Sequence, residues 1–239
     1  MAIATVIEFK TPSTLKETDL GLIKEINAGL YRLRAQRVDQ ITVEGRLIES
    51  KLAWKLAVYR EAVLWRIVAL TESVALNWNC DNVVGMYLPA RALIETSALL
   101  LDLEHELKKH FASRDIAALD ALLTSRTFAT RDKKWIEKDP QSEAINILTL
   151  IDRFDKRTDS GIRRHYDLMS ERCHPNYLGH HQLYGTLDVD TGTTSFSETK
   201  DIERHRDVIL GATLLLLLDE NCIDRLENEI DRVAALQNA

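Results

Sequence analysis

Apolar residues recur at three- and four-residue steps along most of the chain, which is the spacing of one face of an α-helix. Three long segments of this kind fill its first half, from about Thr14 to Gln40, from about 46 to 79 and from about Val83 to Phe111. The third segment is apolar nearly all round in its first half, and a helix without a polar face is normally central. We therefore expect residues 83–111 to lie in the middle of the core.

Shorter helical patterns follow at residues 113–123 and 142–157, and a further helix after Gly161 carries residues 165–174. Pro175 closes the last of these, because the residue before a proline avoids the α region. From Gln182 to Phe196 the pattern becomes typical of a β-hairpin or an ordered loop. A final helix is expected from about Thr199 to Leu236. The prediction is an all-α fold: a multi-helix bundle with long helices and a small β-hairpin or ordered loop near 182–197, in a single domain over residues 1–239.

Composition agrees with a helical fold and narrows the function classes. The chain has only 9 Gly and 4 Pro in 239 residues, too few for a turn-rich sheet protein. Its net charge of -6 provides no global cationic field for nucleic acids or anionic membranes, so any nucleic-acid contact must be local. The three cysteines, at positions 80, 173 and 222, lie far apart and suit a reducing compartment, so we expect a cytoplasmic protein.

Membrane association is not expected from the sequence. Residues 1–10 lack a basic segment followed by a sustained apolar stretch, so they do not resemble a secretory signal. The longest largely apolar run, Val208 to Leu218, has 11 residues, whereas a membrane span needs about 20. This run is predicted to be a buried helix segment.

Two charged residues stand alone in the apolar third helix, between Asp81 and Asp102. They are Arg91 and Glu95, and their i, i+4 spacing puts them on one face. On a buried helix each charge must find a partner, because desolvation is otherwise costly. The pair either forms a structural ion pair that fixes the position of the helix or marks a polar pocket.

A second polar line lies on the helix before Pro175. Tyr166, Ser170 and His174 follow one another at four-residue steps, so they lie along one side of that helix. We expect Ser170 and His174 at the edge of the buried face, where a hydroxyl and an imidazole could project into a pocket. The alternative is that His174 caps its own helix, since the dipole favours an imidazolium at a helix C-terminus.

The sequence Arg91-Ala-Leu-Ile-Glu95, together with Tyr166-x-x-x-Ser170-x-x-x-His174-Pro, resembles a signature of bacterial helical proteins related to HEPN domains and abortive-infection proteins. The similarity covers about residues 83–176. It implies a dimeric helical bundle and, for active HEPN members, metal-independent RNA cleavage by an Arg and a His spaced R-x4-6-H. None of the seven histidines here has an arginine at that spacing, so Arg91 would be the catalytic arginine beside His174.

Histidines at 165, 174, 180 and 181 raise the question of a metal site. Glu171 and His174 form an E-x-x-H motif, but a ferritin-like di-iron site needs a second such motif, which is absent. A mononuclear site built from His174, His180 or His181 with Glu171 stays open. We predict no metal ion and no other cofactor for this protein.

Two function classes follow from these residues. In the first, a polar pocket binds or cleaves RNA or a phosphate ester, as in phage defence or a toxin–antitoxin pair. His174 would then act as general acid/base and Arg91 would steady the phosphoryl charge, with Glu95, Tyr166 and Ser170 binding the substrate. In the second, the same residues form a buried structural network in a dimeric interaction protein with no catalytic activity.

The predicted helix lengths favour a homodimer in both cases. Two helices of nearly forty residues are longer than a compact single domain of this mass needs, so part of their apolar surface should meet a second copy. Besides a second copy of the chain, the expected partner is RNA under the first hypothesis and another protein under the second.

Overall fold

The computed structural model describes residues 6–12, 15–198 and 202–237. The helices of the first half are α1 (Glu17–Gln36), α2 (Arg46–Glu49), α3 (Lys51–Asn79), α4 (Val83–Ser113) and α5 (Ile116–Thr127). The second half contains α6 (Lys133–Lys138), η1 (Pro140–Ser142), α7 (Ile147–Thr158), α8 (Ile162–Cys173), η2 (Tyr177–His181), α9 (Gln182–Tyr184), β1 (Gly185–Asp188), β2 (Thr193–Phe196), α10 (Ile202–Thr213) and α11 (Leu215–Gln237). The all-α prediction is confirmed.

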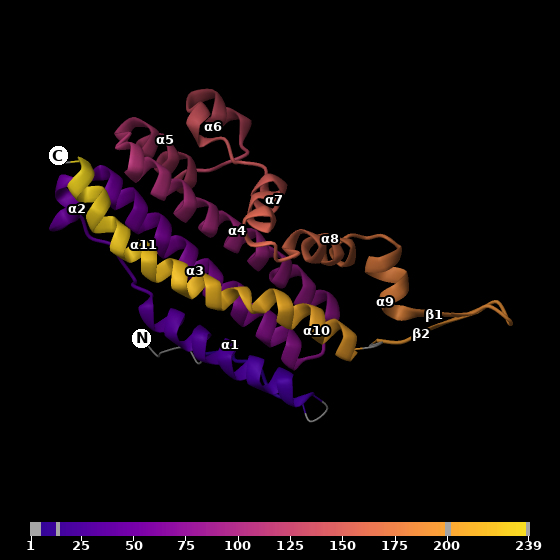
Figure 1. The fold of residues 1–239 in the computed structure, drawn as a ribbon. Coiled ribbons are helices and arrows are strands. Elements are labelled where there is room, and N and C mark those ends of the chain that lie inside the picture. The colour runs from indigo at the N-terminus through magenta and orange to yellow at the C-terminus, as the bar shows by residue number, and fades with distance from the viewer. Residues whose placement is uncertain (1–5, 13–14, 199–201, 238–239) are drawn as a thin grey trace.

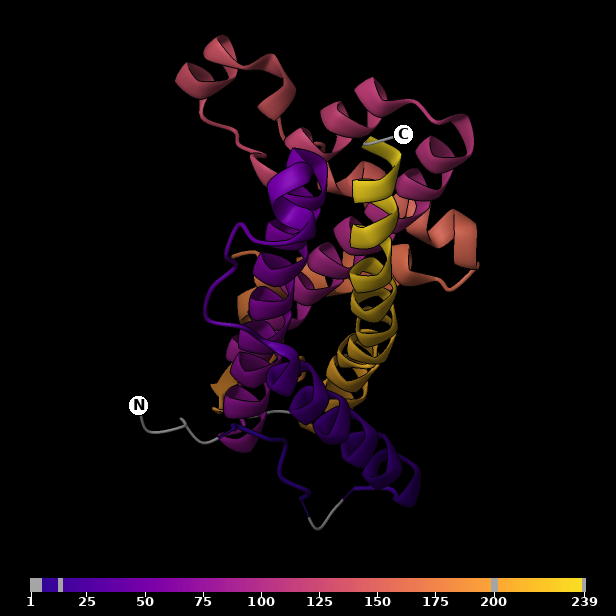
Figure 2. The same ribbon diagram turned by 90° about the vertical axis from the view of Figure 1, so that its left-hand side faces the viewer.

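The core is built around α4, as its apolar pattern predicts. This helix contacts α3, α5, α7, α8, α10 and α11, and Leu93, Ile94 and Leu103 on it are fully buried. A short turn joins it antiparallel to α3, and the Asn82 side chain caps its first turn by accepting from Gly85 N. Two views show α11 beside α3, with α1 lying across both (Figures 1 and 2). α4 is therefore the element from which a buried site is positioned.

Two of the predicted long helices are each divided in two, because the chain breaks where side chains bond to the backbone. Ser50 has an extended backbone, and its Oγ accepts from Ala53 N, so α3 starts afresh after the short α2. In the last helical stretch, Thr213 Oγ1 donates to the Ile209 carbonyl at 2.7 Å, a bond that bends helices, and α10 and α11 separate there. The predicted first residues of two helices, Thr14 and Thr199, lie outside the described residues.

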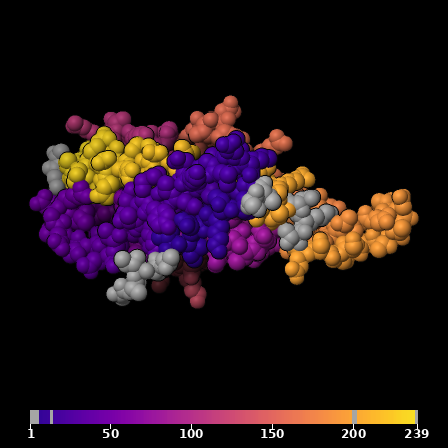
Figure 3. Space-filling view, turned by 90° about the horizontal axis from the view of Figure 1, so that it is seen from below, coloured from indigo at the N-terminus to yellow at the C-terminus, as the bar shows by residue number. Residues whose placement is uncertain are grey.

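The predicted hairpin is confirmed, with one change at its start. β1 and β2 pair antiparallel, with Gly185 opposite Phe196 and Asp188 opposite Thr193, and Gly192 takes a positive φ in the turn. Residues 182–184 form the short helix α9 instead of a strand. The hairpin extends from one end of the bundle (Figure 3).

Among the described residues, one helix is long and apolar enough to cross a membrane by those two criteria alone. It is α4, and half of its most apolar stretch is buried among the other helices.

Candidate functional site

Arg91, Glu95 and Tyr166 form a hydrogen-bonded triad that joins α4 to α8. Tyr166 Oη donates to Glu95 Oε1 at 2.8 Å and accepts from Arg91 Nη2 at 3.0 Å. Arg91 Nη2 also lies 3.2 Å from Glu95 Oε1, and its guanidinium lies over the Tyr166 ring at 5.2 Å from the centroid. The structure thus brings together three of the five predicted site residues from two helices, with Tyr166 lying 71 positions after Glu95 in the sequence.

The triad is partly accessible to solvent. Tyr166 is 3% exposed, whereas the Arg91 and Glu95 side chains are 27% and 25% exposed. Burial and the hydrogen bond to Glu95 raise the pKa of Tyr166 above its ordinary value, against the opposing effect of Arg91. The Tyr166 hydroxyl therefore keeps its proton and donates a hydrogen bond to Glu95. The triad is thus a stable link between α4 and α8.

Ser170 and His174 are not part of this triad. Ser170 Oγ is buried close enough to the Tyr166 hydroxyl to lower its pKa, but it makes no hydrogen bond of normal geometry among the described residues. His174 is exposed, and across residues 6–12, 15–198 and 202–237 no hydrogen bond or ion pair engages its imidazole. Pro175 explains this outcome: it forces an extended backbone on His174, with φ -85° and ψ 148°, so α8 ends at Cys173 and His174 leaves the helical line.

The other histidines of this region do not gather into a metal site. No group of three or more His, Cys, Asp or Glu side chains that could hold a metal ion occurs in the part of the chain that the structure describes. Asn176 Nδ2 donates to Glu171 Oε2 at 2.7 Å, and the His181 ring lies 5.2 Å from that of Tyr177.

A cavity of about 570 Å³ opens beside the triad, between α3, α4, the end of α5 and the loops on either side of α6. We call it the arginine-lined cavity. Its polar and charged walls include Tyr59, Arg66, Arg91, Glu95, Arg126 and Arg131. Four arginines and one glutamate give it a formal surplus of three positive charges.

Several donors of this cavity lack acceptors. Arg66 Nε donates to Thr96 Oγ1 at 3.0 Å, but neither Arg66 nor Arg131 has a carboxylate partner among the described residues. Arg126 Nε and Tyr59 Oη are buried without any hydrogen-bond partner there. Burial raises the pKa of Tyr59 to about 12, so its hydroxyl keeps its proton. The cavity is therefore rich in unused donors and poor in acceptors.

Asp102 holds Arg126 at the cavity wall. This carboxylate is 1% exposed, and it accepts from Arg126 Nη2 at 2.7 Å and from Arg157 Nη2 at 2.9 Å. Arg153 Nη1 lies 3.5 Å away. One negative charge is shared among three arginines, so it secures α5 and α7 to α4 without neutralising the cations around it.

Sequence reasoning missed Tyr59, Arg66, Arg126 and Arg131. A signal for Arg66 existed: it lies seven residues after Tyr59 and three after Val63, so a cation continues an otherwise apolar helical face. Arg126 and Arg131 carried no comparable signal, because they reach the cavity through the packing of α5 on α4, which no local spacing encodes.

Comparisons with known proteins add no family assignment. No protein-family model matches the chain, and no significant match was found among curated proteins or solved structures. The resemblance to HEPN-related proteins therefore stays a prediction.

Proposed function

We propose that this chain is a HEPN-like helical protein that binds RNA or a smaller phosphate ester through the arginine-lined cavity. The observation that carries the proposal is the surplus of donors: four guanidinium groups face a space with a single carboxylate. Guanidinium groups pair with phosphate oxygens through two parallel hydrogen bonds, which makes arginine the preferred residue for phosphate recognition. A cytoplasmic role in phage defence or a toxin–antitoxin system is the context that the resemblance implies.

Binding, rather than cleavage, is the activity that the geometry supports. Metal-independent cleavage needs a general acid/base within hydrogen-bond reach of the scissile bond. His174, the predicted candidate, is exposed beyond the end of α8 and is not among the residues that line the cavity. Arg91 does line it, so its predicted contact with a phosphoryl group forms part of the proposal, whereas Tyr166 and Ser170 act as structural support.

A second candidate is the non-catalytic homodimeric interaction protein in which the triad is purely structural. The observation in its favour is that Arg91, Glu95 and Tyr166 bond to one another. The two candidates differ in what they expect of Arg66, which lies outside the triad but lines the same cavity. Only the binding proposal requires this side chain.

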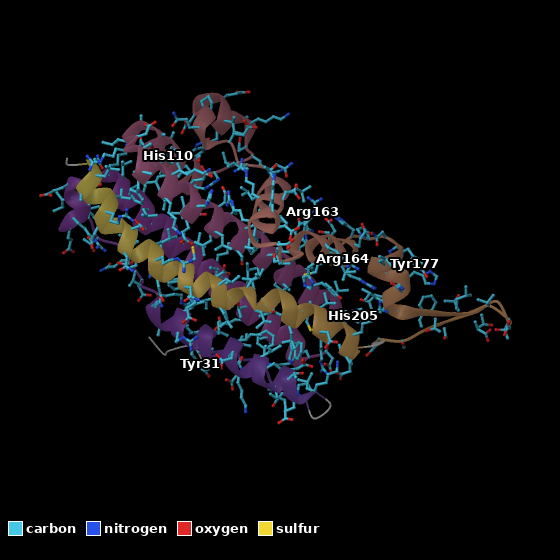
Figure 4. All side chains as sticks on the ribbon, viewed as in Figure 1. Tyr31, His110, Arg163, Arg164, Tyr177 and His205 are labelled. Carbon is cyan, nitrogen blue, oxygen red and sulfur yellow. The ribbon has the colours of Figure 1, made fainter. Side chains whose placement is uncertain are left out.

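Isothermal titration of the full chain with AMP and with a short 5′-phosphorylated RNA tests the proposal. Arg66→Gln should weaken binding roughly tenfold, the loss of one charge-assisted contact. Arg164→Gln is the matched control, because Arg164 is an exposed arginine of α8 that does not line the cavity (Figure 4). No binding by the wild type, or an equal loss in both variants, would overturn the proposal.

A further inference from the structure

The arginine-lined cavity has two ends, each with its own donors. α3 and α4 run antiparallel, and the bond from Arg66 Nε to Thr96 Oγ1 shows that these two positions face each other. Arg91 lies at this level too, because its guanidinium reaches one turn along α4 to Glu95. We call this the Arg91 end.

The second end lies farther along both helices. Tyr59 precedes Arg66 by seven positions on α3, about 10 Å along the axis at 1.5 Å per residue. Arg126 reaches the same level from α5, because it pairs with Asp102, six positions beyond Thr96 on α4. The buried Tyr59 Oη and Arg126 Nε, both without a partner among the described residues, belong here. We call this the Arg126 end.

The stretch between the two ends is aliphatic. Val63 of α3 and Leu99 of α4 lie between the two levels and line the cavity. The loop before α7 adds Ala144 and Ile145 to the lining, and the first residue of α7 adds Ile147. A polar chain crossing this stretch would lose its hydration without finding hydrogen-bond partners, whereas an apolar group would be buried favourably.

The volume of the cavity also limits the ligand. About 570 Å³ falls within the range of small-molecule sites. A long single strand of nucleic acid is instead held in an open groove that follows its backbone. The ligand of the cavity is therefore a small molecule or the end of a short nucleic-acid strand.

Resting on the proposed function, we infer that the ligand of this cavity carries two anionic groups, at least one of them a phosphate, joined by an apolar spacer about 10 Å long. One anion pairs with Arg66 and Arg91. The other binds at the Arg126 end, whose wall holds two donors without a partner among the described residues, Arg126 Nε and Tyr59 Oη. The aliphatic middle of the cavity receives the spacer.

A series of polymethylene bisphosphonates with short, medium and long spacers, measured against methylphosphonate, tests this inference by titration calorimetry. A spacer that spans both ends should bind at least tenfold more tightly than methylphosphonate, because the second contact becomes intramolecular. A 5′-phosphorylated dinucleotide in the same assay tests the apolar spacer. It should bind more weakly than the best bisphosphonate, because its sugar and base would lose their hydration in the aliphatic middle. Tighter binding of the dinucleotide would overturn the apolar spacer.

Two variants test which residues bind the anion at each end of the cavity. Tyr59→Phe removes a hydroxyl that has no partner, so the fold should be retained while the best bisphosphonate loses severalfold in affinity and methylphosphonate binds as before. Arg66→Gln should weaken both ligands. Affinity that does not depend on spacer length, or a Tyr59→Phe variant that binds the best bisphosphonate as the wild type does, overturns the inference but leaves the proposed function standing. Failure of every phosphonate and of AMP to bind overturns both.

Discussion

The two ends of the arginine-lined cavity hold their cations in different ways. At the Arg91 end, the guanidinium of Arg91, the Glu95 carboxylate and the Tyr166 hydroxyl satisfy one another while partly open to solvent. At the Arg126 end, the single buried carboxylate of Asp102 serves three arginines, and two buried polar atoms at the cavity wall have no partner among the described residues. The first end is therefore linked by its own side chains, whereas the two partnerless donors of the second end need an added acceptor.

The largest effect is expected at the Arg126 end. Asp102→Ala leaves Arg126, whose side chain is 2% exposed, buried beside Arg157 without a carboxylate. Removing one partner of a buried pair costs about 3–5 kcal/mol in the free energy of unfolding. Urea denaturation of the variant and the wild type measures this, and a loss below about 1 kcal/mol would show that Asp102 does not hold this end together.

Another buried carboxylate, Asp219 of α11, has no arginine partner among the described residues. Its side chain is fully buried, and its one hydrogen-bond partner among the described residues is Ser97 Oγ, at 2.7 Å. Burial raises the pKa of Asp219 to about 7. The folded protein therefore keeps a proton that the unfolded chain, with a carboxyl pKa of about 3.9, loses as the pH rises.

Stability should accordingly fall as the pH rises from about 4 to about 7, by up to about 1.4 kcal/mol per pH unit, and this contribution should stay constant above pH 7. Urea denaturation at pH 5 and at pH 7 gives the difference, about 2 kcal/mol from this group. Asp219→Asn should remove that difference. A variant with the same pH dependence as the wild type would mean that Asp219 is ionised in the fold.

At the Arg91 end, Glu95→Gln should lower the stability by less than the changes above. The same substitution should raise the affinity for AMP. The loss of stability should be about 1 kcal/mol, because the ion pair is a quarter exposed and the amide can still accept from Tyr166. Removing the only negative charge of the lining should tighten the binding of AMP severalfold. Weaker binding of AMP by this variant would contradict the assignment of Arg91 to the ligand.

The smallest effect is expected at His174, outside both ends. His174→Gln should change the unfolding free energy by less than about 0.5 kcal/mol, as is usual for exposed positions, and leave AMP binding unchanged. Parallel calorimetry and thermal melts measure both quantities. A clear loss of ligand affinity in this variant would restore His174 to the site.

Much of the fold could be predicted from the sequence, because helical periodicity and capping are local. The central position of α4, the end of α8 shortly before Pro175 and the hairpin all follow from short patterns. The approach of Arg91 to Tyr166 could be anticipated as well, since an isolated charge on a buried helix must find a polar partner. The Arg126 end could not, because its residues meet only through the packing of α5 and α7 on α4.

Anion binding in the arginine-lined cavity is tested most directly by locating an anion in the protein itself. Crystals of the full chain soaked in tungstate, a heavy oxyanion of the same charge and shape as a phosphate dianion, would reveal bound ions by anomalous scattering. We expect one ion within hydrogen-bond reach of Arg66 and Arg91, and a second at the Arg126 end, beside Tyr59 and Arg126. Tungstate bound elsewhere on the surface, with the arginine-lined cavity left without an ion, would contradict this expectation.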